Sequence, residues 1–245
     1  PRAKGSGNPH LCMASDGSPS PFSESIQLLG ASLEEAVRMG TRAVIITSSS
    51  PGEGKTTLSI NLARVLAQYD HRVLLVDGNL RKPDVARALG LDNTEGLASA
   101  LRQGHNPEDH IVSAGAIHVL ADDTPDHSPV ALLSSPKART FFDRVRQDYD
   151  VVLVDAPPVP GFADTRIMAQ STDGVIVVVK AGATDVDQLD QLKKALAETG
   201  TTVLGAVLNF APKGEYKHLR SIKYGLSVRP RGICKILRRR NPGKA

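Results

Sequence analysis

Residues 48–57 read Ser-Ser-Ser-Pro-Gly-Glu-Gly-Lys-Thr-Thr, and they follow the apolar run Ala43–Ile46. That run has the length and the β-branched content of a buried strand, and the residues after the loop have the pattern of a helix. A strand that ends in a loop of small residues and continues as a helix directs several backbone N–H groups into one concavity, beside the positive end of the helix dipole. The stretch therefore predicts a phosphate-binding loop.

Each residue type in this loop suits that role. Glycines let the backbone approach phosphate without an intervening Cβ, the lysine can reach the terminal phosphates, and the following hydroxyl can bind Mg²⁺. The pattern G-x-x-x-x-G-K-[ST] is missed only at its first position, where Ser49 replaces glycine. We expect a polyphosphate group and Mg²⁺ as ligands, with contacts from Ser50, Gly52, Glu53, Gly54, Lys55, Thr56 and Thr57.

Composition favours one large α/β core. The chain has 245 residues, of which 40% are hydrophobic and only 4% aromatic, so the core must consist mainly of aliphatic side chains. Cys12 and Cys234 lie far apart in polar or basic sequence, which indicates neither a metal quartet nor a disulfide framework. No apolar run approaches the roughly 20 residues that cross a bilayer. The sequence predicts a soluble protein as given, and it leaves open a membrane segment upstream of Pro1.

Positive charge is concentrated at the carboxyl end. Residues 212–245 contain 11 Lys or Arg against one acid, Glu215, a net charge of +10, whereas the whole chain carries +4. A basic segment of this kind is attracted to anionic lipid, at about 1 kcal/mol per basic residue near the surface. We expect an anionic membrane surface, rather than nucleic acid, as its partner; a tail that is merely solvated is the alternative.

Strand and helix patterns alternate along the chain. Residues 1–21 predict a disordered linker, residues 22–211 one domain, and residues 212–245 a flexible tail. Residues 22–39 predict an amphipathic helix, with a break at Gly30, and residues 90–135 predict short helices and loops around the site. Strands are expected at 43–47, 72–77, 117–120, 151–155, 174–180 and 203–209, and helices at 56–68, 82–89, 136–147 and 186–198. This order predicts an α/β fold with a mostly parallel sheet and helices on both faces, as in P-loop NTPases.

Two of the predicted strands end in aspartate, at Asp77 and Asp155. In a parallel sheet both carboxylates would lie at the carboxyl edge, where ligands bind beside the phosphate loop. One acid could hold Mg²⁺ and the other could accept a proton from an attacking hydroxyl. An isolated aspartate after a strand is more often a turn former or helix cap.

Three stretches together resemble the bacterial tyrosine kinases, P-loop kinases linked to capsule and exopolysaccharide assembly. They are Ser48–Thr57, Leu74–Pro83 (Leu-Leu-Val-Asp-Gly-Asn-Leu-Arg-Lys-Pro) and Asp150–Pro158 (Asp-Val-Val-Leu-Val-Asp-Ala-Pro-Pro). The segments Val177–Gly182 and Gly205–Asn209, and also Asp164, look like further family landmarks. The resemblance covers about residues 22–211.

The resemblance implies a protein-tyrosine kinase that depends on Mg-ATP and regulates polysaccharide synthesis or export. It implies catalytic roles for Lys55, Asp77 and Asp155, metal ligation by Thr56, Asp77 and Asp155, and an adenine contact by Asn209. It also implies tyrosine-containing protein substrates and a membrane-bound polysaccharide co-polymerase or activator, or a fused membrane segment. The location implied is cytoplasmic, at the inner face of the plasma membrane.

The chain departs from the family pattern at two places. Asn79 stands where the strand-D-x-D-x-R motif has its second aspartate, and Gln27 and Gly30 stand at the arginines of an E-x-x-R-x-x-R helix that begins at Glu24. The neutral amide leaves the site one negative charge short. These departures favour, as an alternative, an ATP-binding scaffold with weak catalysis. A surface-binding ATPase of the partitioning type is a further alternative, although its early second lysine is replaced by Ser50.

Overall fold

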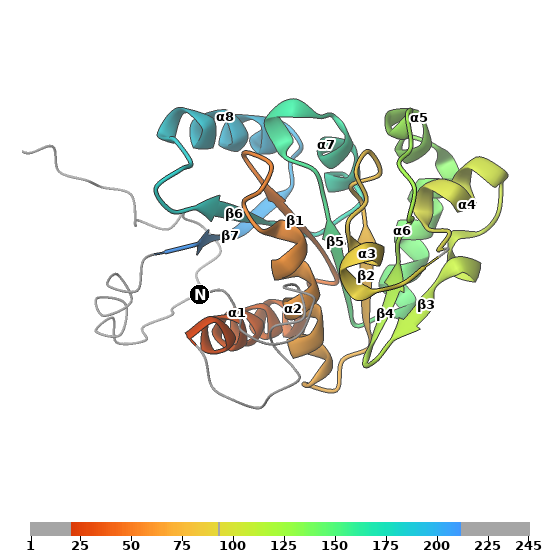
Figure 1. Ribbon diagram of the computed structural model, residues 1–245, viewed down its shortest axis with the longest axis horizontal. Coiled ribbons are helices and arrows are strands. Elements are labelled where there is room, and N and C mark those ends of the chain that lie inside the picture. The colour runs from red at the N-terminus through yellow and green to blue at the C-terminus, as the bar shows by residue number, and fades with distance from the viewer. Residues whose placement is uncertain (1–20, 93, 212–245) are drawn as a thin grey trace, which may run out of the picture.

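A seven-stranded sheet forms the centre of the protein. The computed structural model describes residues 21–92 and 94–211. The strand order is β3-β4-β2-β5-β1-β6-β7, and Figure 1 shows the sheet running from β7 at the left to β3 at the right. All neighbouring pairs are parallel except β3 with β4. The strands are β1 (Ala43–Ser48), β2 (Val73–Asp77), β3 (Val112–Ala114), β4 (Ile117–Leu120), β5 (Val151–Asp155), β6 (Gly174–Lys180) and β7 (Thr202–Asn209).

Helices cover both faces of this sheet. Helices α1 to α3 contribute to one buried cluster and α4 to α8 to the other, so each face has its own core. This is the predicted α/β P-loop architecture. The helices are α1 (Pro21–Arg38), α2 (Lys55–Ala67), α3 (Val85–Leu89), α4 (Leu97–Gln103), α5 (Pro129–Leu133), α6 (Pro136–Asp148), α7 (Asp164–Ala169) and α8 (Val186–Ala197), with 3-10 turns η2 (Pro107–His110) and η3 (Val159–Gly161).

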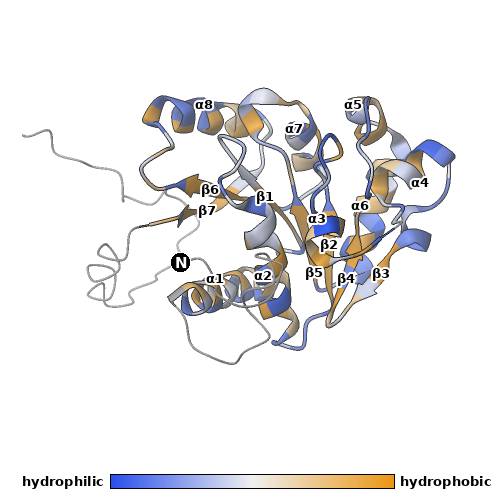
Figure 2. Ribbon diagram, viewed as in Figure 1, coloured by the Kyte–Doolittle hydropathy of each residue, from blue (hydrophilic) through white to orange (hydrophobic). Residues whose placement is uncertain are grey.

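The middle strands lie entirely inside the protein. Every residue of β1, β2 and β5 is buried, which explains why these strands are apolar on both faces. Figure 2 shows this as a hydrophobic centre among helices whose outer faces are hydrophilic. Because the backbone of these strands is held on both sides, the residues at their carboxyl ends have well-defined positions.

The structure corrects several expectations. Helix α1 continues through Gly30 without a break. A Cβ at this position would lie 2.6 Å from Cγ1 of Val65, so glycine here permits close packing of α1 on α2. The helix expected at 82–89 begins at Val85. Strand β3 was missed because it is three residues long and mostly exposed at the sheet edge. The seventh strand, β7, is half-exposed instead of buried on both faces.

The two predicted end segments, residues 1–21 and 212–245, lie outside the described residues, apart from Pro21, which begins α1. Within the described ranges, no helix combines the length and the apolar character needed to cross a membrane.

Candidate nucleotide and metal site

The loop of residues 49–54 connects the end of β1 to the first turn of α2. Gly52 and Gly54 have φ values of 75° and 92°, which other residues rarely adopt. A Cβ on Gly54 would lie 2.2 Å from Nδ2 of Asn209, whereas the space around Gly52 is open. Gly54 is also the N-cap of α2, so the first N–H groups of a 13-residue helix begin at this loop. The loop has the backbone shape that phosphate binding requires.

Lys55 is held at the start of α2 with 8% of its surface exposed. Its Nζ donates to Oγ of Ser48 at 2.9 Å, and this hydroxyl donates to the carbonyl of Ser50 at 2.7 Å. Burial lowers the pKa of Lys55, and the negative charges of Asp155 and Glu53 oppose that shift. The ammonium group therefore lies inside the loop and lacks the full hydration of a surface lysine.

Thr56 and Asp155 meet where α2 begins and β5 ends. The hydroxyl of Thr56 donates to Oδ2 of Asp155 at 2.5 Å, and that of Ser59 lies 3.3 Å from Oδ1. The Thr57 carbonyl accepts a bond from Asn61 Nδ2 at 2.7 Å, within the same helix. A hydroxyl and a carboxylate side by side form an oxygen donor set that suits a hard cation such as Mg²⁺.

Asp77 lies in register with Asp155 on the adjacent strand, so the structure brings the two aspartates together. Asp77 is fully buried. Its Oδ1 accepts the N–H of Asn79 at 3.0 Å, and its Oδ2 accepts those of Asp84 and Val85 at 2.9 and 3.0 Å. The carboxylate thereby holds the connection from β2 to α3.

The two carboxyl groups share a buried environment that disfavours ionisation. Burial raises the pKa of Asp155 to about 6, against hydrogen bonding by Thr56 and the charge of Lys55. Burial and then the charge of Asp155 raise the pKa of Asp77 well above its usual value. A cation bound here would offset this cost, because it favours the charged form of both groups.

Glu53 is an internal support of the loop. It is 2% exposed and accepts hydrogen bonds from the N–H of Ser50 at 2.9 Å, from Ser49 Oγ at 3.2 Å and from the hydroxyl of Thr184. Burial raises the pKa of Glu53, but the bonds from Thr184 and Ser50 outweigh it and leave that pKa below its usual value. Sequence reasoning expected Glu53 to contact nucleotide and missed Thr184, which is 131 positions away and belongs to no recognisable motif.

Asn209 supports the same loop from the end of β7. Its Nδ2 donates to the carbonyl of Glu53 at 2.9 Å, and its Oδ1 accepts the N–H of Phe210 at 2.9 Å. Phe210 has a positive φ of 59°, and the centre of its ring lies 5.2 Å from Nζ of Lys180. The amide that was expected beside adenine thus already contacts the phosphate loop.

The motif after β2 makes two contacts that the sequence did not predict. The side chain of Asn79 donates to the carbonyl of Lys82 at 2.8 Å, so it closes the turn. Arg81 donates two hydrogen bonds to the fully buried Asp164, from Nε at 2.7 Å and from a terminal nitrogen at 3.2 Å. The Cζ atom of Arg81 also lies 5.0 Å from the ring centre of Phe162. This pair joins the loop after β2 to the start of α7.

Comparison with known proteins shows the family of the chain. A family model described as an AAA domain matches residues 41–204. The chain is 38% identical over 170 residues to the tyrosine-protein kinase YwqD of Bacillus subtilis, covering 69% of this chain and 72% of that protein. The chain belongs to the bacterial tyrosine-kinase family of capsule and exopolysaccharide synthesis. The predicted family and its enzyme class, a P-loop tyrosine-protein kinase, are confirmed, and such a domain binds nucleotide.

Other members of the tyrosine-kinase family differ in how much of them the chain covers. The chain is 31% identical over 208 residues to EpsB of Ralstonia solanacearum, which is 84% of this chain but 28% of EpsB. The solved structure of the chimerical protein CapA2B2 superposes with a TM-score of 0.75 at 32% identity, covering 81% of this chain and 88% of that one.

Proposed function

We propose that this kinase domain transfers the γ-phosphoryl group of Mg-ATP to tyrosine hydroxyls and thereby regulates polysaccharide synthesis or export. The observation that carries the proposal is the convergence of Lys55, Thr56, Asp77 and Asp155 on one edge of the sheet, at the open loop of residues 49–54. Phosphoryl transfer depends mainly on positioning and charge stabilisation, and these residues supply both.

Within this site, the loop backbone and Lys55 bind the β and γ phosphates. Release of Lys55 Nζ from Ser48 lets the ammonium turn toward the nucleotide, where a charge-assisted contact is stronger than the bond to a neutral hydroxyl. Thr56 and Asp155 hold Mg²⁺, because their oxygens are already adjacent. Bound Mg²⁺ would supply positive charge to offset that of the phosphates, and Asp77 is the carboxylate in register with Asp155 on the adjacent strand.

We assign Asp77 as the proton acceptor for the tyrosine hydroxyl and as a further oxygen donor toward the metal. Both of its oxygens accept backbone N–H groups of residues 79, 84 and 85, so the assignment requires this turn to open when nucleotide and substrate bind. Asn209 is the proposed adenine contact, since its side chain lies against Glu53 and Gly54 at the rim of the loop.

A membrane-bound activator is the proposed partner, and the inner face of the plasma membrane the proposed location. The high similarity to the chimerical CapA2B2 supports a partner of the CapA type. The net charge of +10 on residues 212–245 supports added attraction to anionic lipid. Deletion of residues 212–245 should abolish sedimentation with acidic liposomes at low salt. Equal sedimentation of the deleted protein would contradict the lipid role.

Product analysis separates this proposal from its alternatives. Incubation of the protein with Mg-ATP, its activator and a tyrosine-containing acceptor should yield ADP together with phosphotyrosine. ADP without phosphotyrosine would instead indicate a partitioning-type ATPase. Bound ATP with neither product would indicate a scaffold, the reading that Asn79 favours because it lacks a charge.

A further inference from the structure

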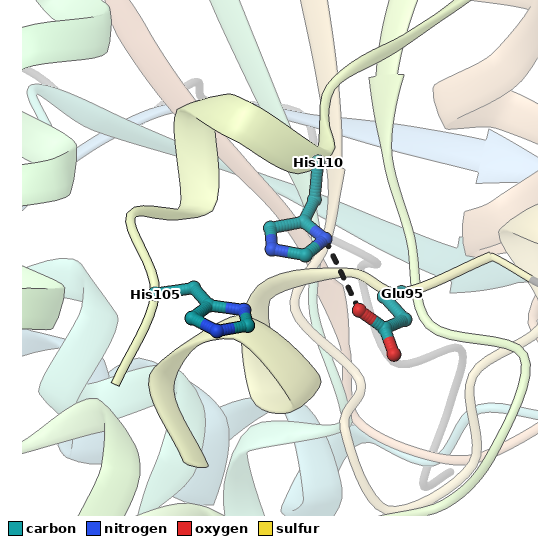
Figure 3. Close-up of side chains that lie close together, drawn as sticks. All are labelled: Glu95, His105 and His110. Carbon is teal, nitrogen blue, oxygen red and sulfur yellow. Dashed lines mark ion pairs between the residues drawn. The ribbon is translucent and has the colours of Figure 1, made fainter. Parts of the chain in front are cut away.

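Three metal-binding side chains gather at a place that the nucleotide site does not use. Glu95 lies just before α4, His105 just after it, and His110 ends η2. Figure 3 shows the Glu95 carboxylate directed at the His110 ring, with the His105 ring beside them. One ligand atom from each residue lies within 4.8 Å of the others. We propose that Glu95, His105 and His110 form a binding site for a divalent transition metal, with Zn²⁺ as the best match.

The distance between His110 and Glu95 suits two ligands of one metal ion. Nδ1 of His110 and Oε2 of Glu95 are 3.4 Å apart. A charge-assisted hydrogen bond would be about 2.8 Å long, whereas two ligands on a tetrahedral Zn²⁺ with bonds of about 2.1 Å lie about 3.4 Å apart. The pair is therefore too far apart for a strong hydrogen bond and correctly spaced to share a cation. The ligand atom of His105 lies within 4.8 Å of those of Glu95 and His110, and the exposed side chain of His105 can move the rest of the way.

The two histidine rings are neighbours, and one of them must turn about its side-chain bonds before both can bind the same ion, because the nitrogen lone pairs lie in the ring planes. The two rings are stacked with centres 5.6 Å apart and an angle of 10° between planes. Gly104, in the left-handed conformation at φ 79°, ends α4, and the N–H of His105 then bonds back to the carbonyl of Ala100 at 2.9 Å. This turn returns His105 toward η2. Two neutral imidazoles with a carboxylate make the His₂Glu set that zinc uses when a fourth position is left to water.

The remaining oxygen of Glu95 has a partner that orients it. Nε2 of Gln103 donates to Oε1 of Glu95 at 3.1 Å, which leaves Oε2 to face His110. Hydrogen-bond partners of this kind commonly orient the carboxylates that bind metals. The backbone is anchored as well, because the N–H of Gly96 donates to buried Asp122 at 3.0 Å. Glu95 and His105 are exposed, so a metal ion can enter from solvent.

A nitrogen-rich donor set distinguishes this site from the one at the phosphate loop. Mg²⁺ prefers oxygen ligands in octahedral geometry, whereas imidazole selects zinc and its neighbours in the first transition row. Zn²⁺ here would tie both ends of α4 to η2. The inference is independent of the proposed kinase activity, since none of its residues belongs to the nucleotide site.

A Zn²⁺ titration of the full chain, without an affinity tag and against a chromophoric chelator, tests the inference. We expect one Zn²⁺ to bind in millimolar Mg²⁺, and binding to weaken by more than about 100-fold in the double variant His105→Gln/His110→Gln and by about tenfold in Gln103→Ala. His127→Gln, at an exposed histidine outside the cluster, should bind as the parent does. A parent that binds no Zn²⁺, or a double variant that binds it equally, would overturn the inference. Bound Co²⁺ in the parent should give the intense visible bands of a tetrahedral site.

Discussion

The hydroxyl of Thr56 lies 2.5 Å from Oδ2 of Asp155, so the first turn of α2 and the end of β5 meet at one pair of oxygens. Neither element could place this pair alone, because the two residues are 99 positions apart. The proposed Mg²⁺ site depends on this contact.

Replacement of Asp155 by asparagine should weaken Mg²⁺-dependent ATP binding by at least about tenfold. The amide keeps the shape of the side chain but removes a charge that, at a buried position, is worth more than the ~1 kcal/mol of an exposed pair. Calorimetric titration of ATP at several Mg²⁺ concentrations measures the effect. Asp143→Asn, at an exposed position on α6, serves as the control. An unchanged Mg²⁺ dependence in Asp155→Asn would place the metal elsewhere.

Stability without ligands should respond to the same carboxylate. The native pKa of Asp155 is raised to about 6, from an ordinary value of 3.8, so the folded state binds a proton more tightly than the unfolded state between these values. The contribution of this group is therefore present at low pH and is lost as pH rises from about 4 to 6. Urea unfolding across that range should show a steeper fall in the parent than in Asp155→Asn. Parallel curves for the two proteins would refute the assigned shift.

Removal of the Lys55 ammonium should abolish ATP binding without harming the fold. At an ATP concentration 100 times Kd, binding would stabilise the parent by about 2.7 kcal/mol, and Lys55→Met should lose most of this. Without ATP, Lys55→Met should be as stable as the parent. Burial lowers the pKa of Lys55 because it disfavours the charged ammonium, whereas methionine suits a buried position. Thermal unfolding with and without Mg-ATP measures both effects, with Lys193→Met on α8 as a surface control. A full ATP-induced shift in Lys55→Met would disprove the role of the loop.

The pair between Arg81 and Asp164 should matter more to stability than a nearby exposed pair. Arg81→Met leaves the fully buried Asp164 without its cation, at a cost of about 3 kcal/mol. Arg166→Met on α7 removes a partner of Glu198 in a pair exposed at both ends, and should cost less than about 1 kcal/mol. Urea denaturation of both variants provides the comparison. Equal costs would mean that Arg81 is not a structural link between the loop after β2 and α7.

Local patterns in the sequence predicted the scaffold well. The sequence placed β5, β6 and the carboxyl ends of β2 and β4 correctly. A buried strand appears in a short window as a continuous apolar run between turn residues, and an amphipathic helix as a repeat of apolar residues. The same reasoning placed Asp77 and Asp155 at the carboxyl edge of the sheet, but that their strands are neighbours became known only from the structure. Gly30 was misread as a break, since helix propensity says nothing of the close approach to Val65 that requires a glycine.

The supports of the site could not be predicted from local sequence. Glu53 is held by Thr184, and its carbonyl is held by Asn209, at separations of 131 and 156 positions. Contacts at such separations arise only when the sheet brings β6 and β7 beside the phosphate loop. The same holds for Arg81 with Asp164, where both residues were noted within motifs but their pairing depends on how α7 packs.

We predict that this chain phosphorylates tyrosine through the loop that holds Lys55. The most direct test is transfer of label from γ-labelled ATP to a tyrosine-containing acceptor protein, in the presence of Mg²⁺ and the membrane activator, followed by phosphoamino-acid analysis. We predict label on tyrosine in the parent and none in Lys55→Met, whereas Lys193→Met should behave as the parent does. Label absent from tyrosine in the parent, or equally present in Lys55→Met, would mean that the chain does not phosphorylate tyrosine through this loop.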